Sequence, residues 1–190
     1  MKWRNDDQRY GAVTVGLHWL VALVVFALFG LGLYMVELDY YHPWYRSAPH
    51  WHRSIGLLLL AVVLVRLIWR VLSPPPAAPE QHRAWEKAGA RLAHWALYLL
   101  LLVAMVSGYL ISTADGAPIQ VFNWFSVPSL TGRRSGLEDL AGAVHYWATW
   151  AVIVLAALHA LAALKHHFID RDDTLRRIFG LAPRRPSSHR

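Results

Sequence analysis

The sequence contains no cysteine and few charged residues. The absence of cysteine among 190 residues excludes disulfide scaffolds, thiolate nucleophiles and metal or iron–sulfur sites held by thiolates. Only 16% of the residues are charged, against roughly 25% in soluble domains, whereas 56% are hydrophobic. This composition excludes a disordered chain and argues against a soluble globule, and the length allows one domain or at most two small ones.

Four apolar stretches hold most of the hydrophobic residues. Each is long enough to cross the ~30 Å hydrocarbon core of a membrane, which takes about 20 residues in a helix. Apolar side chains surround each stretch instead of following one stripe, which is typical of helices embedded in lipid. The stretches are approximately residues 12–36, 52–72, 92–112 and 143–164. We predict an all-α protein, a four-helix transmembrane bundle that forms one integral-membrane domain over residues 1–190, with a basic, disordered tail at 182–190.

The basic residues predict the orientation of this bundle. If the N-terminus is cytoplasmic, fourteen Lys and Arg residues lie inside and four outside, namely Arg46, Arg53, Arg133 and Arg134. The positive-inside rule favours this arrangement, in which both termini are cytoplasmic. The net charge of +7 then comes from residues that flank the spans, so it does not require a nucleic-acid partner.

Histidines inside the spans are the candidate functional residues, because polar side chains are costly in lipid and usually face the bundle interior. His145 and His159 are fourteen residues apart, which places them on one helix face and about 21 Å apart along the axis. His52 lies at the depth of His145 near the outer surface, and His18 lies at the depth of His159 near the inner one. Paired imidazoles on facing helices can bind a haem iron from both sides. The sequence therefore predicts iron ligation by His52 with His145 and by His18 with His159, and two such haems would form an electron path across the bilayer.

Two of these assignments have competitors. His50 lies two residues before His52, although His52 is better placed because Gly56, four residues on, leaves room for a flat ring. His94 lies at the level of the inner pair and could replace His18 as ligand, contact a haem propionate or a quinone head group, or simply pack. Any single membrane histidine could instead be a hydrogen-bonding residue between helices.

Two arginines are further candidates for cofactor binding. Arg66 is the one full charge well inside a span, and the span cores contain no Asp or Glu to pair with it. A haem propionate would supply the anionic partner; the alternative is that the side chain snorkels toward the inner surface near Arg70. Arg53, beside His52, could play the same role outside or attract a small anion.

The segments between and after the spans carry weaker signals. The apolar stretch Val121–Phe125 is expected to lie along the membrane surface, and Leu175–Leu181 to form a short interfacial helix. Five tryptophans near span ends are expected to be interfacial anchors: Trp19, Trp51, Trp69, Trp95 and Trp147. The remaining histidines are expected to be solvated in loops or the tail, with His166 and His167 as weak candidates for an inner proton or quinone entrance: His42, His82, His166, His167 and His189.

Short motifs in a characteristic order run through almost the whole chain. They are Leu17-His18-Trp19-Leu20, His52-Arg53-Ser54-Ile55-Gly56, Val65-Arg66-Leu67-Ile68-Trp69-Arg70, Ala93-His94-Trp95, Ser107-Gly108-Tyr109, Leu158-His159-Ala160, His166-His167-Phe168 and Asp173-Thr174-Leu175. With them the chain resembles the bacterial cytochrome b561 family, four-helix di-haem b cytochromes of the inner membrane. The resemblance implies that His18, His52, His145 and His159 bind two b-type haems. The outer region with His42, His50 and residues 121–125 departs from the family pattern.

The resemblance also implies electron transfer between haem and a membrane quinone, with ubiquinone as the expected substrate. One activity in this family is the oxidation of periplasmic superoxide with ubiquinone as acceptor, and Arg53 would attract that anion. An alternative is a cytochrome b anchor subunit that passes electrons from a dehydrogenase or hydrogenase partner to quinone, but the sequence shows no fifth membrane-spanning stretch. A haem-free transporter is a third possibility, and it would be expected to carry carboxylates in the span cores.

Overall fold

Four long helices make up most of the protein. The computed structural model describes residues 2–79 and 82–181, so the tail predicted at 182–190 lies outside the described residues. The elements are α1 (Ala12–Val36), α2 (Ser47–Leu72), α3 (Ala84–Thr113), β1 (Ile119–Val121), β2 (Phe125–Val127), α4 (Leu137–Phe168) and α5 (Thr174–Ile178). The four long helices are each long and apolar enough to cross a membrane, which confirms the predicted four-helix transmembrane fold.

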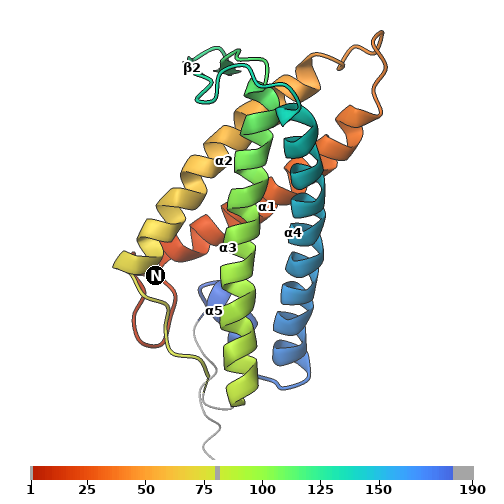
Figure 1. Cartoon of the computed structure of the whole chain (residues 1–190). Helices are drawn as coiled ribbons and strands as arrows, with labels where there is room; N and C mark the ends of the chain where they lie inside the picture. Colours follow the sequence, from red (N-terminus) through yellow and green to blue (C-terminus); the bar gives the residue numbers. More distant parts are fainter. Residues whose placement is uncertain (1, 80–81, 182–190) are drawn as a thin grey trace, which may run out of the picture.

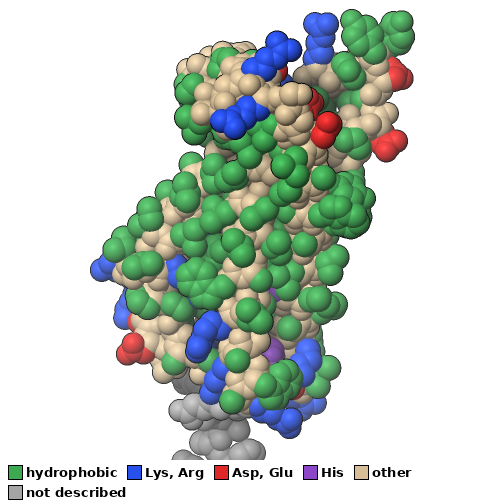
Figure 2. Space-filling view, viewed as in Figure 1, with side chains coloured by type: hydrophobic (Ala, Val, Ile, Leu, Met, Phe, Trp, Pro, Cys, Tyr) green, Lys and Arg blue, Asp and Glu red, His purple; other side chains and the backbone are tan. Residues whose placement is uncertain are grey.

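The helices bury little of their apolar surface against each other. Helices α3 and α4 run side by side and α1 packs on α2, crossing behind α3 in the view of Figure 1. The buried core is small and joins three helices through Val21, Leu28, Leu59, Val63 and Tyr98. Many large apolar side chains on all four helices are exposed, and Figure 2 shows them covering the middle of the molecule with charged groups at its two ends. Such a surface fits the hydrocarbon of a bilayer, and the chain is a multi-pass membrane protein.

A β-hairpin closes one end of the bundle, which we call the hairpin end. Strands β1 and β2 pair antiparallel, and Phe122 and Asn123 between them have the positive φ angles that a type I′ turn requires. The hydroxyl of the fully buried Ser54 on α2 accepts a hydrogen bond from the Phe122 N–H at 3.1 Å. Residues 121–125 therefore form a turn and its flanks docked on α2, with Val121 fully buried, although Trp124 and Phe125 stay exposed.

Residues 2–11 and α5 lie together at the opposite end, which we call the terminal end. Asn5 donates from its side chain to the Ser73 carbonyl at 2.7 Å, where Pro74 to Pro76 end α2. Trp19 donates from its indole to the Ile178 carbonyl at 3.1 Å and stacks on Phe179. The predicted short helix after residue 173 is thus present, and Trp19, expected to anchor in the interface, fixes this helix to α1.

Candidate functional site

His52 on α2 and His145 on α4 face each other inside the hairpin end of the bundle. Their ring centroids lie 6.2 Å apart with an interplanar angle of 76°. Bonds from an imidazole nitrogen to a transition metal are about 2 Å long, so two imidazoles on opposite sides of one metal have centroids about 6 Å apart. The spacing of the two rings fits a shared metal such as a haem iron.

The ring of His145 is fixed in the tautomer that a metal ligand needs. Its Nδ1 lies 2.7 Å from the carbonyl oxygen of Ala104 on α3. A carbonyl can only accept, so Nδ1 donates, and in the neutral ring Nε2 is left without a proton and free to bind. Metal-ligating histidines are usually oriented by such a bond to a backbone carbonyl. Ser107, whose hydroxyl is 3.4 Å from the same Nδ1, packs beside it.

Two glycines lie close to the rings of His52 and His145. A Cβ built on Gly32 would be 3.3 Å from Cε1 of His52, and one on Gly108 would be 3.1 Å from Cε1 of His145. Gly56 and Gly30 face open space instead. The buried Nδ1 of His52 lies near the Leu28 backbone of α1, although the contact falls short of full hydrogen-bond geometry. The two glycines leave both rings the space that a side chain would otherwise fill.

A second histidine group lies deeper toward the terminal end, around His18, His94 and His159. Arg66 donates from Nη2 to Nδ1 of His18 at 3.0 Å. Arginine has no acceptor, so His18 accepts at Nδ1 and, when neutral, carries its proton on Nε2. His18 is within electrostatic range of both His94 and His159. Unlike His145, His18 would have to exchange this hydrogen bond before Nε2 could bind a metal.

His94 is too close to His159 to share one metal with it across opposite faces. Their ring centroids are 5.1 Å apart at 63°, against about 6 Å for two ligands on opposite sides. His94 therefore packs edge-on against His159.

The guanidinium of the partly buried Arg66 lies over the ring of Tyr98. It is 5.5 Å from the Tyr98 ring centroid, and Arg70 approaches the same ring at 5.9 Å. Within residues 2–79 and 82–181, no carboxylate forms an ion pair with Arg66. The guanidinium of Arg66 therefore has no carboxylate partner among the described residues, and it donates to His18 instead. An anionic group of a ligand could take up this position.

Arg53 and His50 lie at the mouth of the hairpin end. Arg53 is exposed and donates from Nε to the Pro49 carbonyl at 3.2 Å. His50 contacts Phe122 of the hairpin edge-on at 6.2 Å, so its ring is turned toward the loop. The sequence at this end also carries five carboxylates, Glu37, Asp39, Asp115, Glu138 and Asp139, against the four arginines predicted to lie outside. The net formal charge of these groups is therefore −1.

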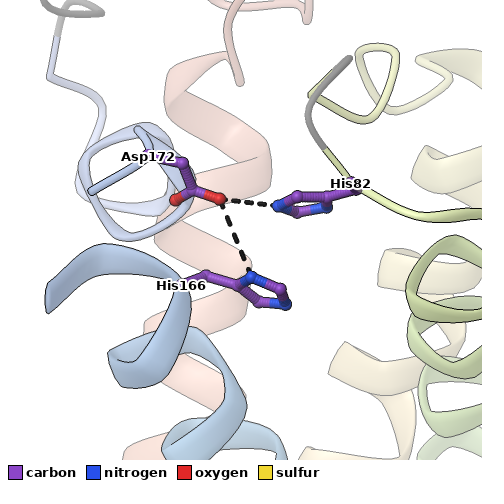
Figure 3. A group of neighbouring side chains, drawn as sticks. All are labelled: His82, His166 and Asp172. Carbon is purple, nitrogen blue, oxygen red and sulfur yellow. Dashed lines mark hydrogen bonds and ion pairs between the residues drawn. The ribbon is translucent and has the colours of Figure 1, made fainter. Parts of the chain in front are cut away.

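A polar cluster at the terminal end was missed by the sequence reasoning, which treated His82 and His166 as solvated loop residues. Helix α4 continues to Phe168, so His166 and His167 belong to its last turn. His82 and His166 converge on Asp172, as Figure 3 shows. Burial tends to raise the pKa of Asp172, but hydrogen bonds from the Thr174 N–H and from His82 bring that pKa below its usual value. Beside this cluster, His166 is hydrogen bonded through Nδ1 to Asp170 at 2.7 Å.

A four-span bundle with facing histidines in its core has the architecture of a membrane cytochrome of the b type. The family model for the prokaryotic cytochrome b561 matches residues 9–181. The chain belongs to this family.

Curated relatives match over nearly their full length. The cytochrome b561 homolog 2 of Escherichia coli (strain K12) is 49% identical over 180 residues, which cover 95% of this chain and 96% of the relative. The cytochrome b561 homolog 1 of the same organism is 29% identical over 183 residues, with 93% and 98% covered. A probable superoxide oxidase, CybB, of Yersinia pestis is 28% identical over 172 residues, with 90% and 96% covered.

Proposed function

We propose that the protein carries two b-type haems and transfers electrons across a bacterial inner membrane, with both chain termini in the cytoplasm and quinone as one redox partner. The observation that carries the proposal is the His52–His145 pair: two rings with centroids 6.2 Å apart, one oriented by a backbone carbonyl, both against glycine. Such preorganisation is expected of axial ligands.

His52 and His145 would hold the haem of the hairpin end, and His18 with His159 the haem nearer the terminal end. When bound, haem iron supplies one-electron redox chemistry whose potential depends on the axial ligands and on burial. His145 keeps Nε2 unprotonated through its bond to Ala104. At the other site Arg66 would release Nδ1 of His18 and neutralise a haem propionate, while His94 supports the ring of His159.

The electron donor would act at the hairpin end, which the basic residues assign to the periplasm. The similarity to a probable superoxide oxidase supports superoxide as this donor. Two superoxide anions would each lose one electron to become O₂, and one ubiquinone would take up these two electrons and two protons. Because the net charge at the hairpin end is not positive, attraction of the anion would depend on Arg53 beside His52 and not on the net charge.

The haem content of the detergent-purified protein tests the proposal. We expect two b-type haems per chain and a reduced-minus-oxidised spectrum of low-spin haem b, with two components in a redox titration. Reduction of the oxidised protein by superoxide would support the donor assignment. A colourless preparation after expression with ample haem would refute the proposal.

The glycine against His145 offers a prediction about haem retention. In Gly108→Ala the new methyl group meets Cε1 and Nδ1 of His145 at 3.1 and 3.3 Å, and this ring cannot retreat without breaking its bond to Ala104. We expect haem to leave the hairpin-end site about tenfold more readily, as for loss of other groups that orient a ligand. Transfer of haem to excess apomyoglobin measures this. Gly30→Ala is the matched control, because nothing lies within 4 Å of its Cβ position; equal loss in both variants would contradict the role of Gly108.

A further inference from the structure

Three side chains from separate segments meet at the terminal end, away from the four histidines assigned to haem. His82 comes from the connection between α2 and α3, His166 from the last turn of α4, and Asp172 from the connection between α4 and α5 (Figure 3). Oδ2 of Asp172 lies 2.6 Å from Nε2 of His82 and 3.9 Å from Nδ1 of His166. The two rings stack with centroids 4.3 Å apart. The side chains are 11%, 14% and 4% exposed in the order His82, His166, Asp172, so the group is largely shielded from solvent.

The carboxylate of this group is fixed by its own neighbours. Thr174 donates from its N–H to Oδ1 of Asp172 at 2.8 Å and from its hydroxyl to Oδ2 at 2.9 Å. The Asp172 N–H in turn donates to the His166 carbonyl at 3.0 Å, which folds the connection back onto α4. An oriented carboxylate with an aligned pair of imidazoles is a preformed ligand set, and groups such as Thr174 are the second shell that positions it.

We propose that His82, His166 and Asp172 bind a divalent transition-metal ion, with Zn²⁺ as the best match. Two imidazoles and one carboxylate suit zinc, whereas Mg²⁺ and Ca²⁺ prefer oxygen ligands throughout. Ligands at about 2.0–2.2 Å from zinc lie about 3.3 Å from one another in tetrahedral geometry. The three ligand atoms here all lie within 4.8 Å of one another, and the two separations from Asp172 fall on either side of that value. Small shifts of the three side chains would convert the hydrogen-bonded group into a metal site with one open position.

The adjacent acidic group is a poorer site for a cation. Glu86 and Asp170 also approach His166, but the ammonium of Lys165 already lies 2.6 Å from Asp170 and 3.2 Å from Glu86. A metal there would be repelled by this charge. At the proposed site His166 would give up its 2.7 Å hydrogen bond to Asp170, and Asp170 would keep Lys165 as its partner.

A metal at this position would cross-link three segments of the chain. It would fix the end of α4 to the α2–α3 connection and hold the start of α5. Helix α5 ends at Ile178, whose carbonyl binds Trp19, the neighbour of His18. The metal would thus stabilise the terminal end of the bundle from outside the haem sites.

Zinc titration tests the proposal. The sample is the full-length, haem-loaded protein with a histidine-free affinity tag, washed with chelator beforehand. We expect one Zn²⁺ per chain by calorimetry and elemental analysis, and a rise in Tm with added Zn²⁺. His82→Ala and Asp172→Asn should lose this binding and the rise in Tm, and Thr174→Val should weaken it about tenfold. His167→Ala is the matched control, since it removes the adjacent histidine outside the group and should bind normally.

The haem spectrum of each variant reports whether the bundle is intact, so a folding failure is separated from a loss of zinc. Absence of stoichiometric zinc binding by the unaltered protein would overturn the proposal. So would unchanged affinity in His82→Ala with an intact haem spectrum, or equal loss in His167→Ala. None of these outcomes depends on whether the haems exchange electrons with quinone.

Discussion

We expect the His145→Ala protein to hold one haem per chain, against the two that we propose for the unaltered protein. The imidazole of His145 is the preorganised half of the hairpin-end pair, because Ala104 fixes its tautomer and Gly108 fits its ring. Alanine removes the metal bond and leaves a void against α3, so His52 alone would face the haem iron. The site nearer the terminal end uses other side chains about 21 Å away along α4, so its haem should remain.

The measurement is the haem-to-protein ratio together with a redox titration, in which one of two components should disappear. His50→Ala is the matched control at the same end, since the His50 ring contacts Phe122 and not His145. It should retain two haems. Loss of haem in His50→Ala with full retention in His145→Ala would exchange the roles of these histidines and contradict the assignment.

The large elements of this fold were predictable because the membrane imposes a simple rule. A span must be apolar for about 20 residues, so both the four helices and the unusual histidines within them are visible in the sequence. Counting residues along each span then gives depth, and equal depth led to the prediction that His52 faces His145. The sequence-based depth argument could not separate His18 from His94, since depth says nothing about rotation of one helix against another.

The fine geometry of the candidate site depends on contacts that no sequence pattern records. The carbonyl of Ala104 orients His145 from another helix, and any residue could supply that carbonyl. The glycines that touch the rings are Gly32 and Gly108, but nothing local distinguishes them from Gly30.

The polar cluster at the terminal end was hidden by chain separation. His82 and Asp172 are ninety residues apart, and each alone looks like an ordinary loop residue. Only the docking of the α4–α5 connection against the α2–α3 connection brings them together. Trp19, expected as an interfacial anchor, likewise donates its hydrogen bond to a distant segment, the carbonyl of Ile178 on α5.

The second large effect expected is the loss of the other haem in His18→Ala and its retention in His94→Ala. The rings of His18 and His94 both lie near His159, so composition and depth do not distinguish them. The 5.1 Å separation of the His94 and His159 centroids is too short for two ligands on opposite faces of one iron, which need about 6 Å. His18 is on α1 and accepts a hydrogen bond from the partly buried Arg66.

In His18→Ala we therefore expect one haem per chain, with the hairpin-end component of the redox titration unchanged, and Arg66 left without its acceptor. In His94→Ala both haems should remain, with at most a shift in the potential of the haem bound by His159, because only a packing neighbour is lost. Spin state separates the two cases: removal of an axial ligand converts any residual haem to high spin, whereas removal of a neighbour leaves it low spin. If His94→Ala gave the high-spin signal and His18→Ala did not, the ligand would be His94. Arg66 and His18 would then form a hydrogen-bonded pair with no bond to iron, since a guanidinium bonded to Nδ1 keeps the ring in the tautomer that carries its proton on Nε2.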